Sequence, residues 1–417
     1  MAASLWFYVE RVLIPYQEAD AASRGRPRGI LSDLYPRWMG TRELLLHHRD
    51  PYSAEVTREI QAGYYGRELD PNRAQDPKDE QRFVYPVYVV FILAPLAPLP
   101  FAAARLTADW TLGLLTAVSV LLWLRVLRWC PSVLTTVVML LLTLNSFPTV
   151  QGIKLEQLSL LVGALLAIAA ASLARGQLFV AGVIFALATI KPQLALLPVA
   201  WLILWALSNW RERHAFFWGW VVSMGLLIGG GEYLLPGWIG RFVAGLAAYE
   251  RYTGGHSLLD ELTTRAGGTL LTILAIAGTA IVCWRARRAP ADSATFHHVL
   301  ALVLAITVLI VPMTAPYNQI LLLPAIFLIV RAWEQLWRKS RLSRALCVLA
   351  VSIVSWPWLT SFALALASLV LPATSVQPAW AVPLWTSIGV PLAILPLLTP
   401  LVADAMRNRT AMDSKAV

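Results

Sequence analysis

Long apolar runs separated by short polar connectors make up most of this chain. They lie near residues 84–104, 110–124, 132–149, 157–174, 177–207, 215–235, 268–284, 297–314, 318–331, 343–371 and 378–403. Runs of about 20 apolar residues are typical of helices that cross a membrane. They are continuous, whereas a transmembrane β-barrel alternates apolar and polar positions. The pattern therefore predicts an all-α, polytopic membrane bundle of about 10–12 transmembrane helices.

The run 177–207 is too long for one straight crossing. Its 31 residues would extend about 46 Å as a helix, against a hydrocarbon core of about 30 Å. Lys191–Pro192 interrupts the run, and proline kinks or breaks a helix. We expect either a tilted, kinked helix or two half-helices that meet at Lys191.

A polar segment near the N-terminus contrasts with the rest of the chain. Residues 17–82 hold 12 of the 24 acidic residues. We therefore divide the chain into a short apolar segment (1–16), a polar extracytoplasmic loop (17–83), a transmembrane bundle (84–403) and a cytoplasmic tail (404–417).

The short apolar segment 1–16 has two interpretations. Leu5–Tyr16 is too short to cross a membrane and carries Glu10 and Arg11. One interpretation is the remnant of a truncated first transmembrane helix, because a polar outer loop needs a preceding span. The other is an interfacial helix that lies on the membrane.

Composition excludes an ordinary soluble protein and indicates an orientation. Hydrophobic residues make up 58% of the chain, charged residues make up 14%, and the mean hydropathy is +0.63. The net charge is +10. In a membrane protein, excess Lys and Arg residues mark the cytoplasmic loops. Basic clusters lie at 211–214, 285–288, 331–344 and 407–415. If the spans alternate, the outer loops are 236–267, 315–317 and 372–377.

Metal-binding patterns do not occur. Cys130, Cys283 and Cys347 lack paired spacing, and the histidines show no HxxxH pattern. We therefore predict neither a disulfide nor a metal site.

The polar loop contains a candidate catalytic carboxylate. The spacing of its Leu and Trp residues predicts an amphipathic helix from about Tyr35 to His47, with Asp33 at the N-terminal boundary. At that position Asp33 either caps the helix or acts as a general base, held at the membrane surface, that accepts a proton from a substrate hydroxyl.

Further candidates surround Asp33 in the sequence. Arg37 and Arg42 lie on or near the same helix, where they either hold a phosphate or pair with Glu43 and Asp50. Tyr52 ends the segment and is a candidate substrate-binding residue.

Polar residues also occur beside and within two apolar runs. Lys154 and Glu156 flank a span, and one interpretation of them is an interfacial ion pair. Gln157 follows directly, and Lys191 and Gln193 lie some 35 residues later. A lysine inside an apolar run usually faces a polar cavity or a partner, so we expect Lys191 to neutralise a phosphate.

Three residues near other loops complete the set. Tyr85 ends the polar loop and suits the aromatic belt at the membrane interface. His256 follows two glycines in an outer loop, where it is either a plain loop residue or a contact to phosphate or sugar, and Asn318 opens a span on the same side. A carboxylate, cations and amides at one membrane face are the groups that sugar transfer from a lipid phosphate requires.

The order of these motifs resembles a known family. The chain contains D-L-Y-x-R-W-x-x-x-R-x-L-L-x-x-x-x-D-P-Y from Asp33, then Phe83-x-Tyr-Pro, Lys154-Leu-Glu-Gln157-Leu-Ser-Leu-Leu, Arg175-Gly and Ala186-x-Ala-Thr-Ile-Lys191-Pro-Gln193. The whole resembles glycosyltransferase family 87, the polyprenyl-phosphate-mannose-dependent mannosyltransferase-like proteins of the GT-C superfamily. It departs from the family where Glu156-Gln157 stands for Gly-Gln and where Gly255-His256-Ser257 stands for Asn-x-Ser.

The resemblance implies a function. It implies a metal-independent, inverting hexosyltransferase without a cofactor, which moves mannose from a polyprenyl-phosphate donor to a lipid or glycan acceptor. It places the catalytic Asp on Asp33, with the active site on the outer face of a bacterial cytoplasmic membrane. It also implies a first span before the polar loop.

Two other functions remain open at this stage. A transporter or lipid flippase also has many spans, although such folds often carry repeated, broken helices in matching positions. A non-catalytic membrane protein that kept the fold but lost the chemistry would show the same hydropathy.

Overall fold

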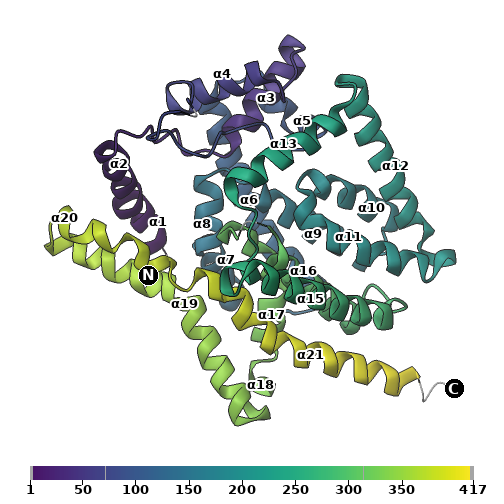
Figure 1. Ribbon diagram of the computed structural model, residues 1–417. Coiled ribbons are helices and arrows are strands. Elements are labelled where there is room, and N and C mark those ends of the chain that lie inside the picture. The colour runs from purple at the N-terminus through teal and green to yellow at the C-terminus, as the bar shows by residue number, and fades with distance from the viewer. Residues whose placement is uncertain (1–2, 71, 313, 414–417) are drawn as a thin grey trace.

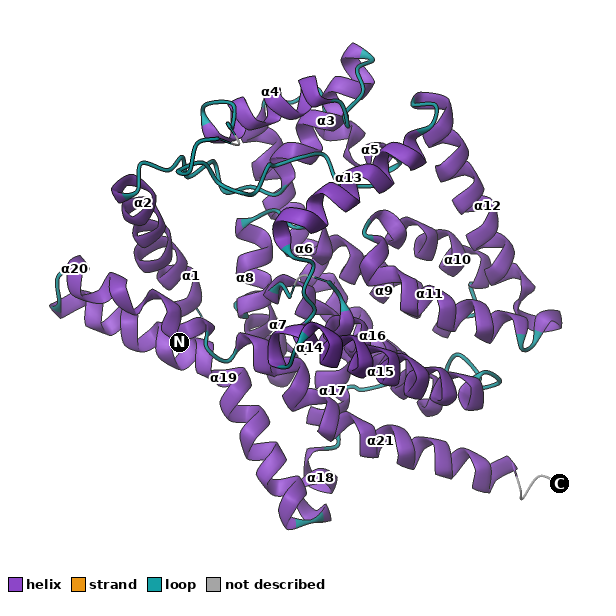
Figure 2. Cartoon of the chain, viewed as in Figure 1, coloured by secondary structure: helices purple, strands orange, loops and turns teal. Residues whose placement is uncertain are grey.

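The chain folds into helices throughout the described residues. The computed structural model describes residues 3–70, 72–312 and 314–413, and no strand occurs among them. Figure 1 shows a bundle of long helices with α3 and α4 at one end of the molecule, and Figure 2 shows that the connectors are short except around α3 and α4.

The helices of the N-terminal region precede the bundle. They are α1 (Ser4–Tyr8), the π-helical turn η1 (Val9–Leu13), α2 (Ile14–Ser23), α3 (Leu34–His47) and α4 (Ala54–Tyr65). The first three follow one another without a break, so this helical stretch is longer than the predicted segment Leu5–Tyr16. It packs against α19.

Two further groups of helices form the bundle. The first group is α5 (Val89–Leu93), η2 (Ala94–Leu96), α6 (Phe101–Val126), α7 (Val133–Leu144), α8 (Phe147–Lys154), α9 (Leu158–Ala174), α10 (Leu178–Leu187), η3 (Ala188–Ile190), α11 (Pro192–Leu207) and α12 (Trp210–Leu234). The second group is α13 (Trp238–Thr253), α14 (Leu258–Leu262), α15 (Arg265–Ala286), α16 (Ala294–Ile310), η4 (Pro316–Leu322), α17 (Leu323–Arg331), α18 (Trp333–Lys339), α19 (Arg341–Val370), α20 (Ala373–Val376), η5 (Gln377–Leu384), η6 (Ser387–Gly389) and α21 (Val390–Asp413).

Several of these helices are suited to cross a membrane, which confirms the predicted polytopic bundle. Within the described residues, five helices are long and apolar enough, or up to seven if each of two bent pairs is one span. The expected 10–12 spans exceed this number. The reason is that four apolar runs form helices of only 10–17 residues, namely α9, α10 with η3, α11 and α16.

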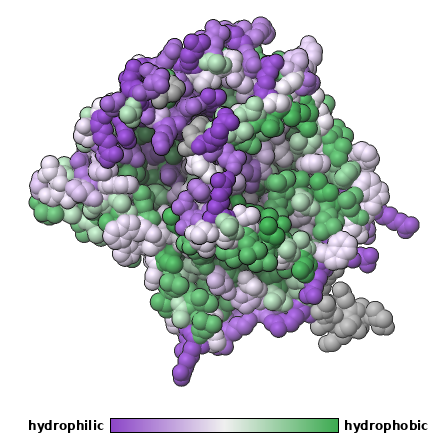
Figure 3. Space-filling model, viewed as in Figure 1, coloured by the Kyte–Doolittle hydropathy of each residue, from purple (hydrophilic) through white to green (hydrophobic). Residues whose placement is uncertain are grey.

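The surface has the polarity that a membrane protein requires. In Figure 3 hydrophilic residues gather at the end that carries α3 and α4 and again near α18, with hydrophobic surface between them. Inside the bundle, α9 is apolar around its whole circumference and nearly all of its residues are buried. A helix that is apolar on all sides is expected at the centre of a fold.

The long run 177–207 is broken at Lys191, as one of the two expectations states. Phe185 of α10 and Trp205 of α11 both lie beside Phe216 of α12, with ring centres 6.2 and 6.1 Å apart. Lys191 lies between them in the sequence, so the chain reverses there. The run therefore forms two short helices whose turn presents Lys191.

The basic connectors gather at one end of the bundle. Arg213 donates to the carbonyl of Arg287 over 2.9 Å, and Arg331 donates to the carbonyl of Leu127 over 2.6 Å. Arg128 pairs with Asp292 at 2.5 Å on the same side. The ends of α6, α11, α15 and α17 therefore meet, as expected if the spans between the basic clusters alternate.

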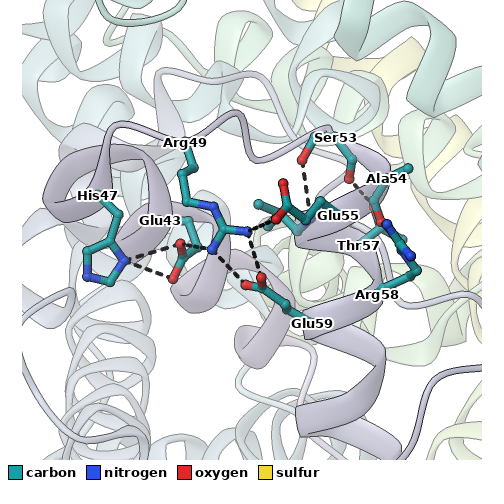
Figure 4. A network of polar contacts seen from close by, with 10 residues as sticks. Glu43, His47, Arg49, Ser53, Ala54, Glu55, Thr57, Arg58 and Glu59 are labelled. Carbon is teal, nitrogen blue, oxygen red and sulfur yellow. Dashed lines mark hydrogen bonds and ion pairs between the residues drawn. The ribbon is translucent and has the colours of Figure 1, made fainter.

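The polar loop is held together by a network around Arg49 (Figure 4). The Arg49 guanidinium lies 2.8 Å from Glu43 in α3 and 2.6 Å from Glu59 in α4. Ser53 caps α4 by accepting from the Val56 N–H at 3.2 Å. This network fixes α3 against α4, and α3 also packs on α5.

Candidate active site

A cavity of about 330 Å³ lies where the polar loop meets the bundle. Its walls come from the start of α3, the connector before α5, the connector between α8 and α9, the turn between α10 and α11, and from α13 and η4. The charged and polar lining residues are Asp33, Arg37, Asp79, Gln81, Arg82, Tyr85, Gln157, Lys191, Gln193, Tyr249, Glu250, Thr253, Tyr317 and Asn318.

Asp33 occupies the predicted helix boundary but does not cap the helix with its side chain. α3 begins at Leu34, and no side-chain cap hydrogen bond is made. Instead, the Asp33 carboxylate accepts a hydrogen bond from the Gln157 amide, and the Asp33 N–H donates to the Leu155 carbonyl at 2.9 Å. The capping interpretation is therefore wrong, and the carboxylate is held in the cavity.

A chain of hydrogen bonds connects Asp33 to the turn at Lys191. Lys191 Nζ donates to Gln157 Oε1 at 2.9 Å and to Ser159 Oγ at 2.6 Å. Ser159 Oγ donates in turn to Asn318 Oδ1 at 2.8 Å. All but Asp33 are buried, so these four contacts fix a carboxylate and an ammonium group relative to each other.

Arg37 brings a second cation to the cavity. It donates to the Asp33 carbonyl, and its guanidinium carbon lies 4.7 Å from the ring centre of Tyr85. Its Nε is buried without a hydrogen-bond partner among the described residues. The alternative in which Arg37 pairs with Glu43 or Asp50 is wrong, because those carboxylates pair with Arg49 and Arg241.

Three predicted substrate-binding residues lie outside the cavity lining. Arg42 donates to the carbonyl of Ala97 at 3.2 Å. Tyr52 donates to the Tyr85 carbonyl at 2.5 Å, and so supports the wall without facing the cavity. His256 is exposed beside Gly255, which does line the cavity. Gln193, in contrast, is a lining residue.

Sequence reasoning missed several residues of this site. Asp79 and Arg82 line the cavity from the connector before α5, where they are two of many charged residues and no pattern distinguishes them. Ser159 lies in an apolar helix. The available signal was its position two residues after Gln157. Gln157 directly precedes α9, so the Ser159 hydroxyl lies in the first turn of that helix.

Aromatic residues form the remaining walls. Tyr85 is 5% exposed, so it is a buried wall residue and not an exposed interfacial anchor as expected. Burial raises the pKa of its hydroxyl, and burial raises the pKa of Tyr249 to about 12. Desolvation likewise raises the pKa of the Asp79 carboxyl. Lys191 Nζ lies 4.8 Å from the ring centre of Tyr317.

The residues before Gln157 differ from expectation. Lys154 pairs with Glu10 and Glu156 pairs with Arg105 at 2.8 Å, so the interpretation as a Lys154–Glu156 ion pair is wrong. Glu156 adopts a left-handed backbone with φ of 46°. That conformation favours glycine, which is the residue that the resembled family carries here. Burial raises the pKa of the Glu156 carboxyl to about 7.

The site therefore combines a carboxylate with two cations, amides and hydroxyls. In the described part of the chain, no group of three or more His, Cys, Asp or Glu side chains could hold a metal ion. The available chemistry is proton transfer by the carboxylate and electrostatic stabilisation of an anion by the cations.

Comparison with known protein families gives a match over the middle of the chain. The family model of glycosyltransferase family 87 matches residues 83–312, more than half of the chain. No curated protein and no solved structure matches the chain. The matched region includes Gln157 and Lys191, whereas Asp33 and Arg37 precede it.

Proposed function

This chain belongs to glycosyltransferase family 87, and on that premise we propose that it transfers a hexose, mannose, from a polyprenyl-phosphate donor to a lipid or glycan acceptor. The reaction forms a bond between the acceptor oxygen and the anomeric carbon and breaks the bond between that carbon and the phosphate oxygen. The acceptor attacks from the face opposite the leaving phosphate, which inverts the configuration. The acceptor hydroxyl loses one proton, and the lipid phosphate leaves as an anion.

Asp33 is the proposed general base. The observation that carries the proposal is that its carboxylate is held in the cavity by Gln157 and is not used to cap α3. A carboxylate within hydrogen-bond reach of an acceptor hydroxyl can take its proton in the transition state. The Asn variant keeps the shape of Asp33 but cannot accept that proton.

Arg37 and Lys191 are the proposed partners of the donor phosphate. Both line the same cavity as Asp33. Negative charge develops on the phosphate as the bond to the sugar breaks, and fixed cations stabilise that charge most when water is excluded. Lys191 is buried and fixed by two hydrogen bonds, so its ammonium group needs little reorganisation during the reaction.

The position of the cavity supports a lipid-linked donor on the outer face of the membrane. The cavity lies at the end of the bundle opposite the basic connectors described above. Because Lys and Arg are enriched in cytoplasmic loops, we assign the Asp33 end to the extracytoplasmic side. The prenyl tail then lies in the membrane beside the apolar surface, while the sugar phosphate enters the cavity.

A transfer assay tests the proposed base. Membranes containing the protein are mixed with radiolabelled polyprenyl-phosphate mannose and bacterial lipid, and the labelled product is counted. We expect Asp33→Asn to lower the rate by about a hundredfold or more, since general-base catalysis contributes roughly 10²–10⁴-fold. The matched control is Asp20→Asn, because Asp20 pairs with Arg24 on α2, outside the cavity lining.

Comparing the wild type with the two variants distinguishes a wrong assignment of the general base from a wrong assignment of the donor. Wild-type transfer by Asp33→Asn, with equal amounts of protein in the membrane, contradicts the role of Asp33. No transfer by any sample contradicts the donor, and other polyprenyl-phosphate sugars are then tried in the same assay.

A further inference from the structure

A second cavity, of about 1010 Å³, lies beside the Asp33 cavity. Among the described residues, none lines both cavities. Leu31 and Leu155 line the second cavity and Asp33 and Gln157 line the first, so the segments 31–33 and 155–157 form the wall between them. The Asp33 N–H donates to the Leu155 carbonyl within this wall. The second cavity is therefore a separate site.

Most of its walls are apolar, and part of them faces the membrane. They come from the N-terminal helical stretch, α6, α8 and η5. Leu106 and Trp110 belong to α6, which is long and apolar enough to be a span, and they are 59% and 76% exposed. Exposed apolar residues on such a helix contact lipid, so an acyl chain can reach the cavity from the bilayer.

Three hydrogen-bond acceptors of the lining residues lie unused in the described structure, namely Asp109 Oδ1, Gln151 Oε1 and Glu156 Oε2. Asp109 is in the first half of α6, and its Oδ1 is buried without a partner in the described residues. Its carboxylate makes no ion pair within 4.0 Å there either. Gln151 Oε1 on α8 is buried and unpartnered in the same way. An ionisable residue inside a membrane helix is costly and usually marks a functional site.

The charges around the cavity balance. Three lining residues are acidic and three are basic, namely Glu10, Asp109, Glu156, Arg28, Arg105 and Lys154. Two of the acidic residues are already paired with two of the basic ones, and Arg28 pairs with Glu18 outside the lining. Because all three basic residues are paired, an anionic headgroup gains little from this lining. A neutral headgroup that donates hydrogen bonds satisfies the free acceptors.

We propose that the second cavity binds a neutral glycolipid, with its sugar hydroxyls donating to Asp109 and Gln151 and its acyl chains against the apolar walls. Hydroxyl groups are the donors that a neutral lipid headgroup offers, and a buried acceptor without a donor is unfavourable. The cavity's apolar lining and its unpartnered acceptors match the two parts of such a molecule. The proposal concerns binding and requires no turnover.

Binding can be measured directly in nanodiscs of phosphatidylcholine. Native mass spectrometry of the full-length protein, titrated with monoglucosyl-diacylglycerol, reports the fraction with one bound glycolipid. Diacylglycerol, which lacks the sugar, and phosphatidylethanolamine, whose headgroup is zwitterionic and carries no sugar hydroxyls, serve as competitors. We expect both competitors to bind at least about tenfold more weakly than the glycolipid. A hydrogen bond to a charged group contributes about 1.5–3 kcal/mol, which is tenfold or more in affinity.

The chain offers a steric variant with a matched control. Gly113 lines the cavity, and an added Cβ would meet only Ile153 at 3.8 Å, which is ordinary contact. We expect Gly113→Phe to fill the cavity and abolish glycolipid binding. Gly278 on α15 has open space around it, so Gly278→Phe should bind like the wild type. Asp109→Asn, which removes the charge but not the side chain, should weaken binding about tenfold.

Each outcome decides the proposal. Saturable glycolipid binding that is lost in Gly113→Phe supports it. Equal binding of diacylglycerol or phosphatidylethanolamine, or unchanged binding in Gly113→Phe, overturns it. Asp33→Asn should bind the glycolipid normally, so a failure of this proposal and a failure of the proposed transfer reaction are distinguishable.

Discussion

At the scale of single residues, Gln157 connects the Asp33 carboxylate to the Lys191 side chain. Its amide donates to Asp33 and accepts from Lys191. Asp33 and Lys191 form no ion pair with each other in the described structure, so the Gln157 amide holds the two side chains at a fixed separation. Gln157 is therefore a positioning residue for two proposed functional groups.

This role predicts the effect of Gln157→Leu. Leu has a similar volume but makes neither hydrogen bond, and hydrogen bonds to charged groups contribute about 1.5–3 kcal/mol. We expect kcat to fall roughly 10- to 100-fold, with a smaller change in the KM for the donor, because the phosphate-binding cations remain. Steady-state transfer rates at varied donor concentration measure both constants.

The matched control for that variant is Gln335→Leu, because Gln335 is exposed near Asp404 at the opposite end of the molecule. A purely structural role for Gln157 would lower the yield of folded protein and leave the kcat of the remainder unchanged. That result contradicts the positioning role.

At the scale of elements, close packing of α10 on α12 supports the turn that presents Lys191. A Cβ added at Gly182 would lie 2.2 Å from the Phe216 carbonyl oxygen, and one added at Gly219 would lie 2.3 Å from the Phe179 carbonyl oxygen. Both obstacles are backbone atoms, which cannot rotate away. Small residues let membrane helices approach this closely.

The packing predicts that Gly182→Ala destabilises the protein. The added methyl group forces α10 away from α12, and overpacking of this kind costs about 1–3 kcal/mol. Thermal unfolding in detergent should show a lower midpoint for Gly182→Ala than for the wild type. Gly225→Ala is the control, since Gly225 lies on the same α12 with nothing within 4 Å. Equal midpoints for the two variants would mean that the contact does not contribute.

At the scale of the whole molecule, the ends of the bundle differ in charge and chemistry. The Asp33 cavity lies at one end, and the basic connectors around Arg128 and Arg213 lie at the other. The run 177–207 forms two short helices that reverse at Lys191, and α11 ends beside the basic connectors, where Arg213 donates to the Trp205 carbonyl.

This arrangement predicts which sites a membrane-impermeant maleimide reaches. Cys130 is exposed beside the basic connectors, whereas Cys283 and Cys347 are buried. Lys78 is exposed in the polar loop. In spheroplasts we expect no labelling of Cys130 and full labelling of Lys78→Cys in a Cys130→Ser background. Disruption of the membrane should expose Cys130 as well. Labelling of Cys130 alone in intact spheroplasts would place the Asp33 cavity in the cytoplasm.

The sequence by itself determined the features that depend on local order along the chain. Apolar runs define membrane helices because each residue's transfer energy is local, and Pro192 breaks its run because it lacks an N–H. The helix after Asp33 and the site residues Gln157 and Lys191 followed from the same kind of signal. The number of long membrane spans did not follow from the sequence. Hydropathy shows where a run is apolar but not how much of that run forms one continuous helix.

Only the tertiary structure decided which side chains meet. Asp33 and Gln157 are 124 positions apart, and Ser159 and Asn318 are 159 positions apart. Nothing in the local pattern around either partner specifies such a pairing, because it depends on how whole helices pack. For the same reason, the contact of Arg42 with the Ala97 carbonyl, the buried position of Tyr85 and the second cavity around Asp109 emerged only from the fold.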